Sequence, residues 1–456
     1  MEKYDVIVIG GGPGGYLAAE RAGHAGLKTM CIEKEHYGGV CLNEGCVPSK
    51  TFLYSAKVLD YANHAKDYGV SVKVENGVDQ GFVVDRKNGV VKTLVSGVKG
   101  QLKKAKVNMV DAEAKIIGKG EGGYVVEAKG EQYLAARLII ATGSMPVVPP
   151  INGLKENVAS GYVMTNKEIL DLREIPGTLA IIGGGVIGLE MASYFSSVGS
   201  KVVVVEMMNK IAGPTDAEIS GILQKSLEKK GVDFRLGAKV TAVEADGVVY
   251  EKDGKVEKVV ADKVLLSIGR RAVTQGFGLE NIGVNLERGA IVTDDHMQTN
   301  VANVYAVGDV NGKVMLAHTA YREAEVAVNN MCGKKDVMRY NVIPSVVYTT
   351  PEIGSVGETE ESAKAKGLSV KTLKLSLMYS GRYVAENTDL SGICKLVVNT
   401  KTNTLIGAHV VGSYASEYIV AVSALIDLEV DIEVIKKLVF PHPTVCEIIR
   451  ETIWSE

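Results

Sequence analysis

The chain has 456 residues, of which 46% are apolar and 23% are charged, and its formal net charge is −3. This length exceeds what one hydrophobic core organises, so two to four domains are expected. The balanced charge leaves no basic footprint for nucleic acid, and the longest apolar runs, such as VIVIG and LIIATG, are far shorter than the ~18–20 residues that cross a bilayer. We therefore expect neither a nucleic-acid partner nor a membrane partner.

The N-terminus and the cysteine count predict the compartment. The first residues, MEKYDVIVIG, enter a strand pattern at once and leave no room for a signal or transit peptide. Six cysteines in a chain of this length do not form the disulfide framework of a small secreted protein. We expect a cytoplasmic protein, in which a close cysteine pair indicates redox or metal chemistry more than a structural cross-link.

Two segments of the chain share one pattern. Residues 4–33 and 178–206 each read as an apolar strand, a glycine-rich turn, a helix with small residues, a second strand and a glutamate. Strands that alternate with helices predict an α/β architecture with parallel sheets. Further strands that end at a glycine are predicted at 137–143, 263–269 and 303–309.

The residue pattern of the sequence changes at two places. Residues 145–153, MPVVPPING, form a Pro-rich break that predicts a linker. From about residue 341, alternating apolar stretches predict antiparallel strands followed by helices, which is an α+β domain. The expected fold is two Rossmann-like dinucleotide-binding domains and a C-terminal α+β domain. The expected limits are 1–146 for the first domain, 147–269 for the second, 270–340 for a return to the first, and 341–456 for the last.

The glycines of both repeated segments fit the pattern G-x-G-x-x-G. They are Gly10, Gly12 and Gly15 in the first segment, and Gly183, Gly185 and Gly188 in the second. In this pattern the first glycine permits a tight turn, the second lets backbone N–H groups approach a pyrophosphate, and the third lets helix and strand pack closely. The alternative is a glycine-rich turn without a ligand, but each motif here follows a strand and opens a helix.

An acidic residue closes each motif at the same distance, at Glu33 and at Glu206. Each carboxylate is expected to accept hydrogen bonds from a ribose 2′-hydroxyl, although an exposed acid at a strand end is the alternative. A glutamate repels a 2′-phosphate, so Glu206 favours NAD over NADP. Ala141-Thr142-Gly143 and Gly308-Asp309 are expected to close around the first cofactor, with Asp309 binding a sugar hydroxyl or serving as a plain turn residue.

Cys41 and Cys46 lie in the segment GGVCLNEGCVPSK. Zinc is a poor explanation, because there is no second cysteine pair and no histidine at short spacing, and no metal site is expected. Residues five apart on a regular helix have Cα atoms roughly 8–9 Å apart, too far for a disulfide, so the helix is expected to be broken between them. A reducible disulfide is favoured over two buried reduced thiols. Cys31, Cys332 and Cys394 are expected to be small core residues.

GGVCLNEGCVPSK resembles the redox-active motif of the flavin-dependent disulfide reductases, the pyridine nucleotide–disulfide oxidoreductase family. The similarity continues along the chain, in order, through the first glycine motif with Tyr16, IGRR (268–271), VYAVGD (304–309), MLAH (315–318), TPE (350–352) and HPTVCE (442–447). The resemblance is strongest to the branch that oxidises dihydrolipoamide, since the CLN…PSK form carries Ser49 where glutathione-type enzymes usually have lysine.

The resemblance implies two cofactors. FAD would occupy the first glycine motif, with Glu33 on its ribose and Asp309 on its ribitol, and NAD would occupy the second. Further cofactor contacts are implied at Lys50, Thr142, Gly143, Glu190, Gly269, Gly308 and Ala317. Lys50 and Glu190 would form a pair near the flavin N5 and the nicotinamide, the alternative being ordinary exposed charges.

The resemblance also implies the catalytic groups. Cys46 would be the charge-transfer thiol against the flavin, Cys41 the interchange thiol that meets substrate, and His442, oriented by Glu447, the base. In the family that base reaches the disulfide from the partner subunit, so a homodimer is implied, with residues from about 341 onward as its dimerisation domain. The implied activity is oxidation of dihydrolipoamide with reduction of NAD⁺ to NADH. The lipoyl group is expected on another protein of a 2-oxoacid dehydrogenase or glycine cleavage complex.

Three alternatives stay open at this point. Another disulfide reductase is one, but mercuric reductases end in a cysteine pair that ETIWSE does not contain, and glutathione-type enzymes favour NADP. An NADH oxidase or diaphorase is the second, although such proteins often lack the cysteine pair. A non-catalytic nucleotide-binding scaffold is the third, and the presence of Cys41, Cys46, His442 and Glu447 together argues against it.

Overall fold

The computed structural model describes residues 1–75 and 77–455. The described chain divides into two compact units by contacts: residues 1–51, 85–147 and 269–340 form the first, and 52–84, 148–268 and 341–456 form the second. The chain passes from the first unit to the second at residues 147–148, inside the predicted linker. The three-domain division expected from the sequence, with its first domain in two segments, stays a prediction. No helix among residues 1–75 and 77–455 is both long and apolar enough to cross a bilayer.

The first unit is built on a mixed sheet with strand order β3-β2-β1-β6-β5-β4 and β19 paired to β6. Its strands are β1 (Glu2–Ile9), β2 (Thr29–Glu33), β3 (Asn108–Asp111), β4 (Ala114–Gly120), β5 (Gly123–Ala128), β6 (Glu131–Ile140) and β19 (Val304–Ala306). β1 pairs in parallel with both β2 and β6, whereas β4 and β5 pair antiparallel. The strands expected at 137–143 and 303–309 are therefore confirmed and lie side by side.

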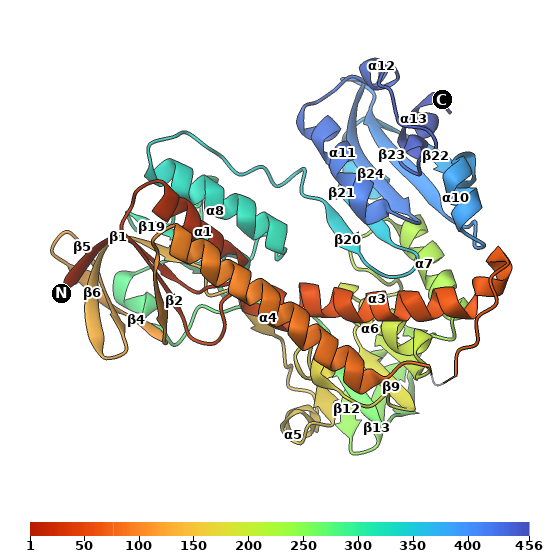
Figure 1. The fold of residues 1–456 in the computed structure, drawn as a ribbon, viewed down its shortest axis with the longest axis horizontal. Helices are drawn as coiled ribbons and strands as arrows, with labels where there is room; N and C mark the ends of the chain where they lie inside the picture. The colour runs from red at the N-terminus through yellow and green to blue at the C-terminus, as the bar shows by residue number, and fades with distance from the viewer. Residues whose placement is uncertain (76, 456) are drawn as a thin grey trace. The chain divides into compact units, whose positions relative to one another are not determined.

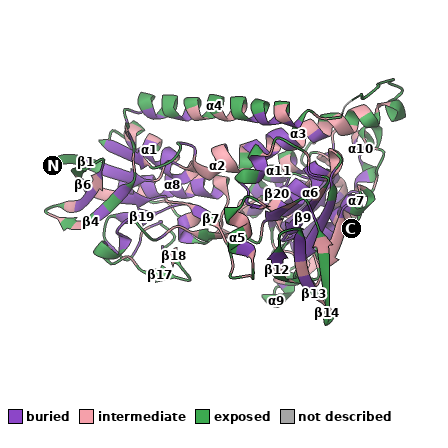
Figure 2. Ribbon diagram, turned by 90° about the horizontal axis from the view of Figure 1, so that it is seen from below, coloured by how far each residue is buried: buried purple, intermediate pink, exposed green. Residues whose placement is uncertain are grey.

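Helices and short elements complete the first unit. They are α1 (Pro13–His24), α2 (Gly39–Glu44), the start of α3 (Cys46–Asn63), most of α4 (Gln80–Lys104), β7 (Ser144–Pro146), β16 (Arg270–Ala272), η3 (Leu279–Ile282), β17 (Leu286–Glu287), β18 (Ala290–Ile291), η4 (Asp309–Asn311) and α8 (Ala317–Met331). α1 and α8 pack against each other (Figure 1). Much of the surface of α4 is exposed, as its green ribbon shows in Figure 2.

The second unit contains a parallel sheet with strand order β11-β10-β9-β15-β8. The elements of this part are η1 (Ala65–Tyr68), α5 (Leu154–Ala159), β8 (Val163–Met164), η2 (Glu168–Asp171), β9 (Thr178–Ile182), α6 (Val186–Ser197), β10 (Lys201–Glu206), α7 (Ala217–Lys229), β11 (Asp233–Leu236), β12 (Lys239–Glu244), β13 (Gly247–Lys252), β14 (Lys255–Val260) and β15 (Lys263–Leu266). The strand expected at 263–269 is thus confirmed as β15, which pairs in parallel with β9.

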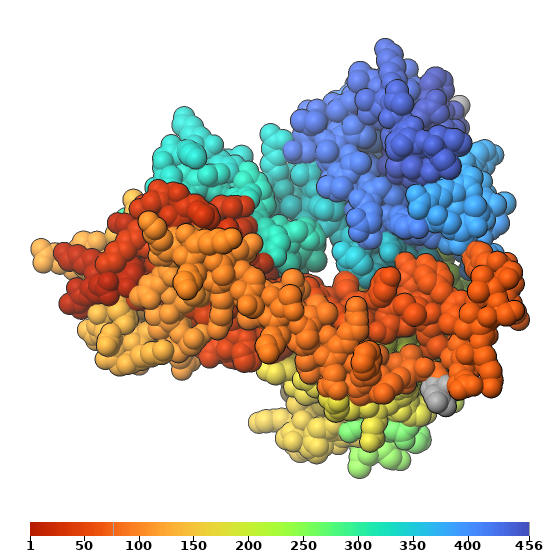
Figure 3. Space-filling view, in the orientation of Figure 1, coloured from red at the N-terminus to blue at the C-terminus, as the bar shows by residue number. Residues whose placement is uncertain are grey.

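The C-terminal part of the second unit is an antiparallel sheet with order β20-β21-β24-β23-β22. Its elements are β20 (Ser345–Val347), β21 (Ile353–Gly357), α9 (Glu360–Ala365), β22 (Val370–Ser376), η5 (Leu377–Tyr379), α10 (Gly381–Glu386), β23 (Ile393–Asn399), β24 (Thr404–Val411), α11 (Ala415–Asp427), α12 (Ile432–Ile435) and α13 (Glu447–Trp454). The atoms of this segment, blue in Figure 3, form one continuous mass. The expected α+β architecture from about residue 341 is confirmed.

Continuous runs of apolar residues in the parallel strands supply much of the core. In β9, Leu179, Ala180 and Ile181 are fully buried, as are Val202 and Val204 of β10. A parallel strand that helices cover on both faces has no solvent side, so it reads as a continuous apolar run. Full burial of each such valine, leucine or isoleucine contributes about 1.5–3 kcal/mol to the free energy of folding, relative to an exposed side chain. These buried strands hold the ends of β9 and β10, and hence the second glycine turn and Glu206, at fixed positions.

The helix break expected between the two cysteines is present. α2 ends at Glu44, Gly45 adopts φ −149° and ψ −108°, and α3 begins at Cys46. Upstream, Gly39 has φ +58°, and a Cβ placed on it would lie 2.6 Å from the Cα of Gly12. Such an approach is closer than carbon atoms tolerate, so α2 packs on the first glycine motif through a glycine–glycine contact.

We predict that Gly39→Ala is considerably more destabilising than Gly26→Ala. Both glycines have positive φ, which costs an alanine about 1–2 kcal/mol, but the Cβ at Gly26 would meet nothing within 4 Å. The clash at Gly39 adds roughly 1–3 kcal/mol because the backbone of one segment must move. Chemical denaturation with matched flavin content measures the difference, and equal losses in the two variants would contradict the glycine–glycine contact.

Candidate functional site

The first glycine turn follows β1 directly. Gly10 has φ +104°, and a Cβ on it would lie 2.2 Å from the carbonyl oxygen of Ala141. A Cβ on Gly15 would lie 1.8 Å from the carbonyl oxygen of Gly10. A side chain at Gly10 would therefore clash with the segment that follows β6, and one at Gly15 would push α1 away from the end of β1. The tight turn and the close helix–strand packing are the two properties that the sequence motif predicts for these glycines.

The second glycine turn repeats this geometry after β9. Gly183 has φ +106°, and its Cβ would lie 2.6 Å from the carbonyl oxygen of Ser267. A Cβ on Gly188 would lie 2.3 Å from the carbonyl oxygen of Gly183. The same steric reasons thus require glycine in both halves of the repeat.

The helices that follow the turns begin without a side-chain cap. The N-cap residues are Gly12 for α1 and Gly185 for α6, and in the described chain no side chain caps either helix. A Cβ on Gly12 would meet nothing closer than 3.7 Å, and on Gly185 nothing closer than 3.9 Å, so space is open beside both N-termini. First-turn N–H groups and the helix dipole are therefore available to an anion, and both sites fit a dinucleotide pyrophosphate.

The acids that close the two motifs are held in the same way. Glu33 accepts the amide of Gly11 at 2.6 Å and that of Glu35 at 2.7 Å, one on each carboxylate oxygen. Glu206 accepts the amides of Gly184 and Met208 at the same two distances. Each carboxylate oxygen keeps a lone pair that a hydroxyl group can use. The predicted binding of a ribose hydroxyl fits this arrangement, and for both residues it stays a prediction.

The carboxylate of Asp309 belongs to a polar chain in the first unit. Ser144 donates its hydroxyl to Asp309 Oδ2 at 2.5 Å, and Arg270 donates Nε to Ser144 Oγ at 2.8 Å. Burial lowers the pKa of Arg270, whereas the charges of Asp309, Glu44 and Cys46 oppose this lowering. Arg270 is therefore a cation within electrostatic reach of the redox pair. The sequence contained it only as part of IGRR, and its role was not predicted.

The remaining predicted cofactor residues of the first unit lie at chain turns. Thr142 donates its hydroxyl to the carbonyl of Val273 at 2.6 Å, and Gly143 and Gly269 both have positive φ. Ala317 is the first residue of α8. Their predicted contacts with FAD or NAD stay predictions.

Glu323 of α8 is a second residue that sequence reasoning missed. Its side chain is fully buried, and it accepts the amide of Gly308 at 2.6 Å and the hydroxyl of Tyr340 at 2.7 Å. It thus fixes the Gly308-Asp309 turn from inside the unit. Glu323 lies in the apolar pattern of a helix, well beyond the VYAVGD motif, and carries no signal of this role.

Burial raises the pKa of Glu323, although hydrogen bonds from Asn311, Tyr340 and Gly308 oppose the shift. The folded chain therefore keeps this proton to a higher pH than the unfolded chain does. The protonated Glu323 contributes to the free energy of unfolding in full below pH 4.5, the ordinary pKa of a glutamate. This contribution is lost as the pH rises through the raised pKa of the folded state.

We predict that Glu323→Gln gains stability relative to the wild type as the pH rises from 4.5 to 8. Glutamine cannot ionise, so the variant does not lose stability on deprotonation at this position. Thermal unfolding of both proteins across this range gives the difference in Tm, which cancels the contributions of other titrating groups. A difference that is constant with pH would contradict the buried-acid interpretation.

Cys41 and Cys46 are brought together at the break between α2 and α3. Both carry free thiols in the structure, and the reducible disulfide expected between them stays a prediction. A hydrogen bond to Cys46 and burial raise the pKa of the Cys41 thiol, whereas Lys50 opposes the shift. Cys46 also begins α3, where the helix dipole favours negative charge.

Two tyrosines lie within electrostatic reach of the cysteines. Tyr16 of α1 and Tyr321 of α8 share a hydrogen bond of 2.5 Å between their hydroxyls. Burial raises the pKa of both phenols, and negative charge on the cysteines raises them further. Tyr16 was noted in the sequence, whereas its partner Tyr321 was not.

His442 and Glu447 meet as predicted. His442 Nδ1 lies 2.9 Å from Glu447 Oε1, and the amide of Thr444 donates to Glu447 Oε2 at 2.8 Å. Burial raises the pKa of Glu447, but the bonds from Thr444 and His442 outweigh it and lower the pKa. A carboxylate can only accept, so His442 Nδ1 carries a proton, and in the neutral ring Nε2 then presents a lone pair. The His442 side chain is 78% exposed in the single chain.

Glu190 lies in α6 of the second unit, where its side chain accepts the amide of Tyr348 at 3.1 Å and is 3% exposed. Lys50 belongs to the first unit, so the predicted Lys50–Glu190 pair stays a prediction. Of the three cysteines expected in the core, Cys31 and Cys394 are buried, but Cys332 is exposed, and that expectation was wrong. Cys332 follows the last residue of α8, where the helix has left the core. Among the described residues, no group of three or more His, Cys, Asp and Glu side chains is placed to hold a metal ion.

Comparison with known proteins agrees with this geometry. Residues 4–324 match the family described as pyridine nucleotide-disulphide oxidoreductase, and residues 343–453 match its dimerisation domain. The chain is 40% identical to a dihydrolipoyl dehydrogenase of Rhizobium etli, over 99% of this chain and 98% of that one. It is 37% identical to the dihydrolipoyl dehydrogenase of Mycoplasma pneumoniae, over 98% and 97% of the two chains.

A solved structure shows the same architecture. The HOCl-induced flavoprotein disulfide reductase RclA from Escherichia coli, as its Cu(II) complex, superposes with a TM-score of 0.87 at 28% identity and covers 100% of both chains. The matches to the family and to its dimerisation domain together span nearly the whole sequence. The chain therefore belongs to the pyridine nucleotide-disulphide oxidoreductase family, whose cofactors are FAD and NAD.

Proposed function

We propose that this chain is a dihydrolipoyl dehydrogenase, which oxidises protein-bound dihydrolipoamide and reduces NAD⁺ to NADH. The observation that carries the proposal is the thiol pair Cys41–Cys46, joined by a hydrogen bond at a glycine break that packs on the first glycine motif. Similarity at 37–40% identity over the full length to proteins named dihydrolipoyl dehydrogenase supports the choice of substrate.

The base in this reaction would be His442. A substrate thiol of pKa ~8.5 is only about 3% thiolate at pH 7, so removal of its proton accelerates attack. Glu447 holds the Nδ1–H of the imidazole at 2.9 Å, which leaves Nε2 to take that proton. The imidazole then carries a positive charge that the carboxylate stabilises.

The cysteines would exchange one disulfide for another. The substrate thiolate attacks Cys41 Sγ in the oxidised pair, the S–S bond breaks, and Cys46 leaves as a thiolate. The second substrate thiol then attacks the mixed disulfide, which releases Cys41 and cyclic lipoamide. The substrate loses two electrons and two protons, and the cysteine pair gains the electrons. Bound FAD supplies the path by which that electron pair reaches NAD⁺ as hydride.

Negative charge on Cys46 would be stabilised by this chain's own groups. Cys46 is the first residue of α3, whose dipole is positive at that end, and Arg270 interacts with it electrostatically. Lys50 lies in the next turn of the same helix and interacts with Cys41. Three sources of positive potential thus converge on the pair, which favours the thiolate that the exchange step produces.

We also propose that the functional form is a cytoplasmic homodimer that acts on a lipoyl-bearing protein. The match to the dimerisation domain supports the dimer, and it includes His442 and Glu447. The largely exposed imidazole of His442 is suited to complete the redox site of a second copy. The lipoyl-bearing partner follows from the substrate, which in this reaction is carried by another protein.

A second candidate is a disulfide reductase with a different substrate, since the RclA likeness covers the full length of both chains. Rates of NAD⁺ reduction with dihydrolipoamide, set beside rates of NADPH oxidation with glutathione disulfide, separate the two activities. We expect the first to dominate, because Glu206 opposes a 2′-phosphate. Glutathione reduction with NADPH as the faster reaction would overturn the proposed function.

We predict that His442→Gln lowers the rate of NAD⁺ reduction by dihydrolipoamide about 10²- to 10⁴-fold, since glutamine cannot take the thiol proton. His64→Gln is the matched control, because His64 is also exposed and bonds a backbone carbonyl through its Nδ1. NADH oxidation by ferricyanide, which draws electrons from the flavin, should change little in either variant. A near-normal dihydrolipoamide rate in the purified His442→Gln protein would remove the residue from this role.

A further inference from the structure

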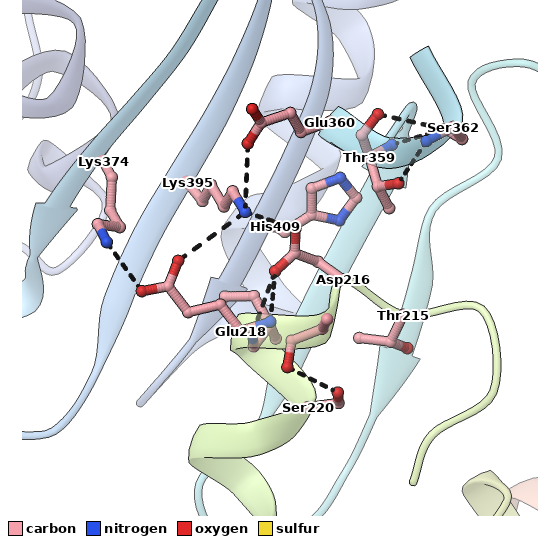
Figure 4. Close-up of polar contacts among 12 residues, drawn as sticks. Thr215, Asp216, Glu218, Ser220, Thr359, Glu360, Ser362, Lys374, Lys395 and His409 are labelled. Carbon is pink, nitrogen blue, oxygen red and sulfur yellow. Dashed lines mark hydrogen bonds and ion pairs between the residues drawn. The ribbon is translucent and has the colours of Figure 1, made fainter. Parts of the chain in front are cut away.

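A buried ion pair joins two parts of the second unit away from the residues described above. Lys395 of β23 points at Asp216 (Figure 4), with its Nζ 2.8 Å from Asp216 Oδ2. The exposed fractions of the two side chains are 7% and 0%. Asp216 is the N-cap of α7 and accepts the amides of Glu218 and Ile219. The lysine therefore reaches from the C-terminal sheet to the helix that follows β10 and Glu206.

The groups around the pair keep both partners charged. Glu218 and Glu360 place carboxylate oxygens 3.8 and 3.9 Å from the Lys395 Nζ. Burial lowers the pKa of Lys395, but the acids around it outweigh this effect and raise it, and Lys395 with the Ile219 amide lowers the pKa of Asp216 despite burial. His409, across the strand pair, donates Nε2–H to the Glu358 carbonyl, and burial lowers its pKa, so its ring is neutral.

Hydrogen bonds lead from Asp216 back to the second glycine turn. The neighbouring Thr215 donates its amide to the carbonyl of Ala212 at 3.2 Å, and Ala212 donates its amide to the carbonyl of Gly184 at 2.9 Å. Gly184 in turn donates its amide to Glu206 Oε2. A series of hydrogen bonds thus connects Asp216, the partner of Lys395, to Glu206 by way of the loop 207–215 and the Gly184 amide.

The middle of that loop, Ile211 and Ala212, is buried in the core of the second unit, whereas its start is exposed. Met207 and Met208, which follow Glu206, are 64% and 59% exposed. Its far end is fixed at Asp216, where Lys210 also bonds the carbonyl of Thr215. A buried ion pair is seldom more stabilising than apolar residues of the same volume, so its presence here is better explained by geometry than by stability.

We propose that Lys395 is a positioning residue for the second dinucleotide site. Lys395 fixes Asp216, which anchors the end of the loop 207–215. That loop in turn holds the Gly184 amide and the Glu206 carboxylate in the geometry that binds the adenosine ribose of NAD. The proposal rests on the proposed role of Glu206. It assigns to the C-terminal domain a part in NAD affinity in addition to dimerisation.

The test compares variants in their binding of ADP-ribose, the part of NAD that contains this ribose, to the FAD-loaded protein by isothermal titration. Lys395→Met should raise the Kd about 3- to 30-fold, the range expected for couplings that act through intervening residues. Asp216→Asn should do the same, because asparagine keeps the helix cap but removes the charge. Lys374→Met is the control, since Lys374 pairs with Glu218 of the same helix but is about half exposed.

The double variant Lys395→Met with Asp216→Asn separates positioning from stability. Each single change removes one partner of the buried pair and should lower the unfolding temperature, whereas the double change removes both charges and should restore much of it. The Kd should stay raised in the double variant. If ADP-ribose affinity instead follows the unfolding temperature, or is unchanged in every variant, the positioning role is wrong.

Steady-state rates with NADH and ferricyanide give a second readout that does not involve the lipoyl substrate. The KM for NADH should rise in Lys395→Met, while kcat at saturating NADH stays close to the wild-type value. A wild-type protein that binds ADP-ribose but does not oxidise dihydrolipoamide would refute the proposed function and leave this inference intact. A lower kcat with unchanged KM would refute the inference alone.

Discussion

Both nucleotide sites depend on a steric constraint, which is that a glycine lies so close to a backbone carbonyl near the end of a strand that no Cβ fits. In each half of the repeat the third glycine of the motif lies against the carbonyl of the first, and the first lies against a neighbouring strand end. No side chain fits there, so the helix begins directly on the strand end. Its first-turn amides then face open space without a capping side chain. These unpaired amides are what a pyrophosphate can bind.

The contrast with α7 shows that this arrangement is specific. That helix begins with Asp216, whose carboxylate accepts the amides of Glu218 and Ile219, so its N-terminus is already satisfied. Asp216 already pairs the first amides of α7, whereas the first amides of α1 and α6 have no side-chain cap and can bind an anion. In the same unit, therefore, one N-terminus is kept for a ligand and the next is used for anchoring by Lys395.

The redox pair depends on the same close packing. Gly39 lies against Gly12, and this contact places α2 and the following break beside the first glycine motif. The break at Gly45 lets Cys41 and Cys46 meet, and the start of α3 puts positive potential on Cys46. One set of glycine contacts thus sets both the phosphate-binding turn and the position of the thiols in the first unit.

Much of this could be predicted from the sequence. The repeat, the parallel strands, the break between the cysteines and the His442–Glu447 contact all follow from local spacing, because neighbours in sequence fix turns, caps and short-range pairs. Arg270, Tyr321 and Glu323 were missed, since each reaches its partner from another segment of the first unit and carries no local pattern. Cys332 was misplaced because burial depends on where the helix leaves the core.

The sequence by itself determined the family, because its motifs resemble those of known members, and the two dinucleotide motifs, because glycine spacing dictates the geometry of a turn. It also predicted which cysteines form the redox pair. Only the tertiary structure decided which distant groups surround them. The Arg270–Ser144–Asp309 chain, the buried Glu323 under Gly308, and the Lys395–Asp216 pair each join different elements of the fold. Such contacts arise from the packing of sheets and helices, which no local pattern of residues records.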